Sequence, residues 1–190
     1  MADNSPFLEQ TDYWTSITRR ADYPRGMGKW MLHTDQPRRL YGILREELMA
    51  GKLAEAYSIK TKTKAPSRRS AVYIHAGPYT DQERLLRLAI EIQALDGIHD
   101  LQLTGPLLYK SDLHNTWCES LARPGDRYYT LLKRNWLYRY SDGTLVVNAV
   151  IQALHQAMED PPENADKEFL LIRSMLPGEL FVGNETQKKK

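Results

Sequence analysis

Residues 54–97, AEAYSIKTKTKAPSRRSAVYIHAGPYTDQERLLRLAIEIQALDG, contain the three elements that decide the fold. From Ala54 to Lys64 apolar and polar side chains alternate, so Ser58, Lys60 and Lys62 share one face of a predicted strand. Residues 71–75 are rich in β-branched and aromatic side chains, which indicates a second strand. The polar turn at residues 66–69 joins the two, and we predict a hairpin with one lysine-rich face.

A helix follows this hairpin. Gly77 and Pro78 end the second strand, and residues 80–83 have the spacing of a capping box, in which side chains satisfy the free amides at a helix start. Apolar residues then recur at helical spacing until Gly97. The segment therefore predicts strand, strand and helix in succession.

The flanking sequence continues this mixture. Residues 29–33 alternate as a strand, and residues 37–51 predict a helix with proline in its first turn. Further strands are predicted at 107–111, 128–132 and 136–140, and a helix from about residue 145 to 158. The class is therefore α+β, and we expect an antiparallel sheet with the helices packed on one face, which leaves the other face for a ligand.

Three regions are expected along the chain. Residues 1–25 form an N-terminal arm, in which Tyr13, Trp14 and Ile17 suit a short docked helix. Residues 26–158 form the core domain, and residues 159–190 form a C-terminal tail with one docked segment at 169–176.

Composition narrows the classes of function. The 190 residues are 42% hydrophobic and 26% charged, with a formal net charge of +2 and one cysteine, Cys118. This composition is typical of a globular protein, and the sequence has no apolar run long enough to span a membrane. The net charge is too small to indicate nucleic-acid binding. A single cysteine and the lack of a secretory signal at the N-terminus predict a reducing compartment, the cytoplasm.

The candidate site consists of basic residues on the predicted strands. Lys29 and His33 share one strand face, and Lys60 and Lys62 share another. If both lie on the same side of one sheet, their charges repel unless an anion screens them, and phosphate is such an anion. His75 comes just before a helix N-terminus, where the helix dipole also favours an anion.

Further phosphate ligands are predicted on other segments. Arg68 and Arg69 follow the lysine-rich strand, Lys110 lies on the strand at 107–111, and Arg127 and Arg134 flank two tyrosines. Two alternatives remain open: lysines also protect edge strands from aggregation, and lone histidines are commonly structural. The spacing of the histidines and the single cysteine predicts no metal site. The sequence has no phosphate loop and no dinucleotide-binding motif, so we expect no cofactor.

The chain also resembles known families. Residues 28–33, 53–62, 72–75 with 79–81, and 108–112 resemble the basophilic-leukaemia-expressed protein family. That resemblance implies the fold of the mRNA cap-binding initiation factor, a curved antiparallel sheet backed by helices. It also implies a nucleotide or RNA ligand.

The same order of elements is more distantly similar to the phosphothreonine lyases of bacterial effectors and lanthipeptide synthetases. Carried over by position, Lys60 or Lys62 would be the base, His33 the acid, and Lys29, Arg68 or Arg69 the phosphate clamp. The family's histidine would fall at Met31, and His33 comes two residues later on the same face. This resemblance implies β-elimination from phosphothreonine or phosphoserine in a peptide or protein, without metal or cofactor. The alternative is non-catalytic binding of a nucleotide or RNA.

Overall fold

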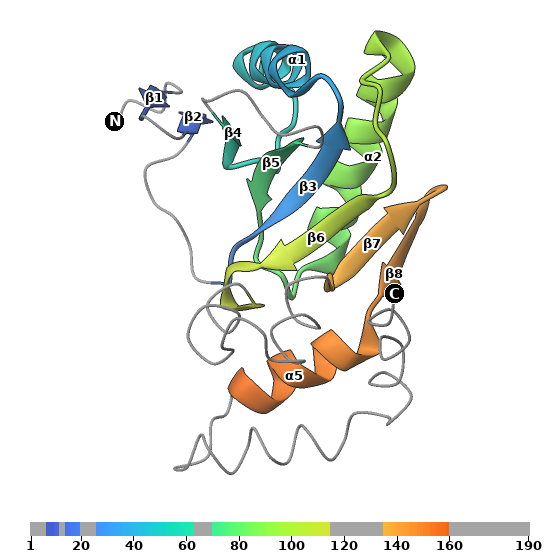
Figure 1. Ribbon diagram of the computed structural model, residues 1–190. Coiled ribbons are helices and arrows are strands. Elements are labelled where there is room, and N and C mark those ends of the chain that lie inside the picture. The colour runs from blue at the N-terminus through green and yellow to red at the C-terminus, as the bar shows by residue number, and fades with distance from the viewer. Residues whose placement is uncertain (1–6, 12–13, 20–25, 63–69, 115–134, 160–190) are drawn as a thin grey trace, which may run out of the picture.

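The computed structural model describes residues 7–11, 14–19, 26–62, 70–114 and 135–159. In this part of the chain eight strands form one antiparallel sheet in the order β1-β2-β4-β5-β3-β6-β7-β8 (Figure 1). The strands are β1 (Phe7–Gln10), β2 (Trp14–Thr18), β3 (Gly28–Thr34), β4 (Ser58–Lys62), β5 (Ser70–Ala76), β6 (Leu107–Ser111), β7 (Tyr138–Ser141) and β8 (Thr144–Val147). The predicted α+β class and antiparallel sheet are confirmed.

The central strand β3 sets the two faces of the sheet. Trp30 and Leu32 are fully buried, whereas the alternate residues Lys29, Met31 and His33 are only partly buried. Antiparallel partners point to the same side of a sheet, so this alternation passes from strand to strand through the register. The side of Trp30 and Leu32 is the core, and the side of Lys29 is the second face.

The helices α1 (Pro37–Met49) and α2 (Gln82–His99) lie on one side of the sheet in Figure 1. Leu40, Leu44 and Leu48 of α1 belong to the same buried cluster as the core residues of β3. α5 (Ala149–Glu159) crosses the end of the sheet and contributes Ile151 to that cluster. In the described residues no helix is long and apolar enough to cross a membrane.

The ends of α2 differ slightly from the prediction. Asp81, not Thr80, is the N-cap, and its side chain accepts a hydrogen bond of 3.0 Å from the Arg84 amide. The helix passes Gly97 and ends at His99, followed by Asp100 in the left-handed conformation. Aspartate tolerates that conformation better than most residues, so a glycine was not needed at this stop.

Three other segments were predicted wrongly. The expected short helix of the N-terminal arm is instead the strand pair β1 and β2, and β2 joins the sheet beside β4. β4 begins at Ser58, not at Ala54. Residues 144–147 form β8, a hairpin with β7, before α5 begins at Ala149, because the Ser141-Asp142-Gly143 turn reverses the chain into the sheet first.

Candidate anion-binding face

The second face of the sheet carries a row of four polar side chains from four strands. Ser58 on β4 pairs with His75 on β5, His75 pairs with Lys29 on β3, and Lys29 pairs with Lys110 on β6. Adjacent strands lie about 4.8 Å apart, so Lys29 has His75 on one side and Lys110 on the other. We call the face of β4, β5, β3 and β6 that carries Lys29, Lys60, Lys62, Lys110, His33 and His75 the basic face.

The next row contains Lys60, Tyr73 and Met31 on neighbouring strands. The Lys29 Nζ atom lies 5.7 Å from the centre of the Tyr73 ring, and the Lys60 Nζ atom lies 4.8 Å from the centre of the Trp14 ring. The two rings meet edge to face with centroids 5.8 Å apart. An aromatic pair therefore lies directly beside two lysines, and the distances from the ammonium groups to the ring centres are short enough for cation–π attraction.

His75 is the titratable group at the centre of this arrangement. Its Nδ1 atom lies 2.8 Å from Ser58 Oγ. Burial lowers the pKa of His75 from 6.5 to about 4, Asp112 opposes that change, and Lys29 and Lys60 add to it. His75 is consequently neutral at pH 7, and only a nearby negative charge would favour its protonated form.

His33 lies at some distance from that row. It is four positions beyond Lys29 on β3, about 13 Å along the strand, and pairs with Ala71. Lys62 follows Lys60 on the same face of β4 and pairs with Trp14 on its other side. His33 and Lys62 thus share the basic face with the central row but are displaced from Lys29 toward the far end of β3 and β4.

The predicted site residues therefore divide into two groups. Lys29, Lys60, Lys62, Lys110, His33 and His75 all lie on the basic face. The four predicted arginines, Arg68, Arg69, Arg127 and Arg134, lie outside the described residues, as does the predicted strand at 128–132.

Sequence reasoning placed Ser58 on the face of Lys60 without giving it a role, and it missed three further residues of this face. Tyr73 is two residues before His75, so the strand period alone could have placed it. Asp112 follows Lys110 by two residues and influences the charge of His75. Trp14 had no usable signal, because its segment showed no strand alternation.

A buried serine–histidine pair lies on the other side of the sheet, at the end of β6. Ser111 Oγ is 2.5 Å from His155 Nε2, and His155 Nδ1 is 2.7 Å from the Ile151 carbonyl oxygen. Because Nδ1 faces a carbonyl, it carries the proton, and Ser111 donates to Nε2. Ser111 is completely buried and His155 is 2% exposed, so this pair joins α5 to the sheet and is closed to a substrate.

No group of three or more histidine, cysteine, aspartate or glutamate side chains in the described ranges is placed to hold a metal ion. No protein-family model matches this sequence, and no curated protein matches it either.

Proposed function

We propose that the basic face binds a phosphorylated ligand. The observation that carries the proposal is the row in which Lys29 lies between His75 and Lys110, with Lys60 in the next row on β4, across β5 from Lys29. Like charges directly opposite one another destabilise a sheet, and a phosphate bound among the three ammonium groups offsets that repulsion. Lys110 is only 8% exposed, so its contact with an anion would be poorly screened by solvent.

A binding experiment tests this proposal. Titration of the full chain with a phosphothreonine peptide should give saturable binding, measured by calorimetry. Lys29→Met should weaken it about tenfold or more, because a charge-assisted hydrogen bond contributes about 1.5–3 kcal/mol. The matched control is Lys52→Met, which removes the same charge from an exposed lysine paired with Glu47. Equal affinity of the two variants, or no binding to the unmodified chain, would overturn the proposal.

On a phosphothreonine or phosphoserine residue the same face is suited to β-elimination. In this proposal Lys60 is the base that takes the proton from Cα, the Cα–Cβ double bond forms, and the Cβ–O bond breaks with its electron pair leaving on the phosphate. A histidine protonates the departing oxygen, and Lys29 and Lys110 hold the phosphate. The products are a dehydroamino acid and inorganic phosphate.

Two histidines are candidates for the acid, and the register separates them. His75 adjoins Lys29 in the central row, and Lys29 and Lys60 both influence its charge. A bound phosphate supplies the negative charge that favours a proton on His75. We therefore assign His75 as the acid and Lys60 as the base. The alternative acid and base are His33 and Lys62, which lie near the other end of β3 and β4.

Mass spectrometry distinguishes these assignments. Phosphopeptides that lose phosphoric acid and gain a double bond indicate elimination, whereas recovery of the free hydroxyl indicates a phosphatase. His75→Asn should abolish elimination while His33→Asn retains it; the reverse result would move the acid to His33. Unchanged phosphopeptides would exclude catalysis on these substrates and leave binding as the function.

The aromatic pair favours a second candidate, a nucleotide or RNA ligand bound without catalysis. Trp14 and Tyr73 lie next to Lys60 and Lys29, so one ligand could place its base on a ring and its phosphate on the lysines. A nucleotide titration should then quench tryptophan fluorescence, and the quenching should weaken with salt. Trp14→Phe identifies the reporter: if the quenching persists unchanged in this variant, the base does not contact Trp14.

A further inference from the structure

A row of apolar side chains lies next to the central row on the basic face. Tyr73 on β5, Met31 on β3 and Leu108 on β6 are neighbours in the register, and we call them the apolar row. Each of the three is two residues along its strand from a member of the central row. Alternate residues of a strand are about 6.7 Å apart, so the two rows run side by side at that spacing.

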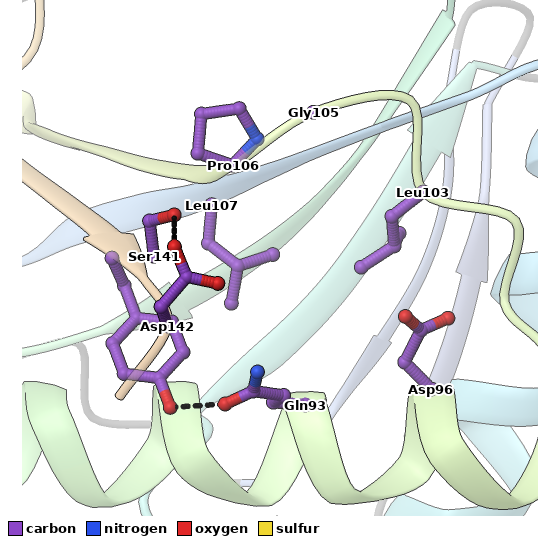
Figure 2. Close-up of a pocket in the computed structure, with 9 residues that line it drawn as sticks. Gln93, Asp96, Leu103, Gly105, Pro106, Leu107, Ser141 and Asp142 are labelled. Atoms are coloured by element: carbon purple, nitrogen blue, oxygen red, sulfur yellow. Dashed lines mark hydrogen bonds between the residues drawn. The ribbon is translucent and has the colours of Figure 1, made fainter. Parts of the chain in front are cut away.

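The apolar row is separate from the hydrophobic core. Leu107 is 4% exposed and points toward α2 (Figure 2), so the next residue, Leu108, points to the basic face. Met31 and Tyr73 alternate in the same way with residues of the buried cluster on β3 and β5. Leu108, Met31 and Tyr73 are all only partly buried. A contiguous group of apolar side chains with a polar rim is typical of a binding surface.

Positive charges lie at both ends of the apolar row. Lys60 on β4 pairs with Tyr73, and Arg139 on β7 pairs with Leu108. Arg139 is exposed and lies on the same side of the sheet as the basic face. The field over the apolar row therefore favours an anionic partner.

A carboxylate lies on the opposite side of the central row. Asp112 is two residues beyond Lys110 in the direction away from the apolar row, and its amide donates a hydrogen bond to the Met27 carbonyl oxygen. A negative charge there disfavours an anionic ligand. A ligand whose phosphate lies in the central row is therefore expected to extend over the apolar row and away from Asp112.

We infer that the ligand of the basic face is a phosphopeptide with a large aliphatic side chain two residues from its phosphorylated threonine or serine. This inference rests on the proposed binding of phosphate at the central row. In an extended peptide, side chains two residues apart point the same way and are about 6.7 Å apart, which is the spacing of the two rows. With the phosphate between Lys29 and Lys110, the aliphatic side chain lies on Met31 and Leu108. Methionine is unbranched and adapts its shape to a partner.

Three peptides of matched length test this spacing by calorimetry with the full chain, where pThr is phosphothreonine. Acetyl-Leu-Gly-pThr-Gly-Leu-amide carries leucine two residues away on both sides, so either direction of binding is sampled. Acetyl-Gly-Leu-pThr-Leu-Gly-amide has the same composition with adjacent leucines, and acetyl-Ser-Gly-pThr-Gly-Ser-amide has none. The first should bind at least about fivefold more tightly than the other two, because one leucine is removed from water on the apolar row.

A pair of variants locates the contact. Leu108→Ala should reduce the preference for the first peptide at least about threefold and leave the affinity for the serine peptide unchanged, which also shows that the variant is folded. The control is Ile98→Ala, which removes a side chain that is 70% exposed on α2, on the other side of the sheet (Figure 1), and should change neither affinity.

The outcomes separate this inference from the proposed function. Equal affinity for the three peptides, or tighter binding of the peptide with adjacent leucines, would overturn the inference and leave phosphate binding intact. No binding of any peptide would overturn both. Binding to vesicles of phosphatidylcholine and phosphatidylserine that Leu108→Ala weakens, with its peptide affinities unchanged, would assign the apolar row to a membrane surface and overturn the inference.

Discussion

Lowering the pH from 7 to 4 is expected to destabilise the fold through His75. The pKa of this residue is about 4 in the folded chain, against an ordinary value of 6.5, mainly because its ring is largely removed from solvent, and the charges of Lys29 and Lys60 lower it further. Between these two values the unfolded chain binds a proton that the folded chain does not. Stability is therefore fully present above about pH 6.5 and falls as the pH falls toward 4.

The size of this effect follows from the difference between the two pKa values. At about 1.36 kcal/mol per pH unit, a fall from 6.5 to about 4 corresponds to about 3 kcal/mol. The side chain is partly exposed, and solvent screening lowers the expected loss to about 2 kcal/mol. A bound phosphate should reduce the loss further, because its negative charge stabilises the protonated imidazole.

Urea unfolding at several pH values measures the loss. Carboxylates also titrate in this range, so the relevant quantity is the difference between the unmodified chain and His75→Asn, whose amide replaces Nδ1 beside Ser58. The variant should lose about 2 kcal/mol less between pH 7 and pH 4. His33→Asn, the same change on the same face, should keep the full loss. A His75 ring that titrates near pH 6.5 by nuclear magnetic resonance, or a variant with an unchanged pH dependence, would refute this account.

Three further predictions concern stability and are measured by urea unfolding. Gly28→Ala should destabilise the chain by about 3 kcal/mol or more, because the added Cβ would lie 2.4 Å from the Lys110 carbonyl oxygen. Its control is Gly42→Ala, which should stabilise α1 by about 0.5–1 kcal/mol, because no atom lies within 4 Å of the added Cβ. A tolerated Gly28→Ala would show that β3 and β6 can separate. Ser111→Ala should cost about 1–3 kcal/mol, because it leaves a buried histidine nitrogen and the His114 amide without their serine partner; a neutral effect would mean that another group replaces the hydroxyl. Arg19→Gln should cost about 2 kcal/mol, since its guanidinium donates to four carbonyl groups, one in the last turn of α1 and three just after it. An unchanged midpoint would mean that water satisfies these carbonyls equally well.

Local patterns in the sequence were sufficient for part of the fold. The alternation of the segment that contains β4 placed Lys60 and Lys62 on one face of a strand, as the structure has them, since the strand period depends only on nearby residues. The period of 3.6 identified α2 in the same way. These are the elements whose side chains are half buried, so the pattern shows which face is covered.

Pairing between distant segments was beyond the same reasoning. Nothing in residues 28–34 indicates that β3 lies between β5 and β6, although this placement brings Lys29 between His75 and Lys110. The pairing of Ser111 with His155 joins residues 44 positions apart and left no trace in spacing. β8 was assigned to the following helix because Val146 and Val147 also fit a helical stripe, and only pairing with β7 decides between the two.

The central row contains one residue from each of four strands, and these residues are far apart in the sequence: Ser58, His75, Lys29 and Lys110. No single strand or hairpin contains that row, so it exists only when the middle of the sheet is assembled. A ligand bound there would slow amide hydrogen exchange in β4, β5, β3 and β6 together, while β1 and β8 at the two edges could open and close without releasing it. Amides in the four central strands would thus exchange slowly when the ligand is bound, while amides in the edge strands would exchange at rates that the ligand does not change. This difference would arise although the hydrogen bonding of the sheet is continuous.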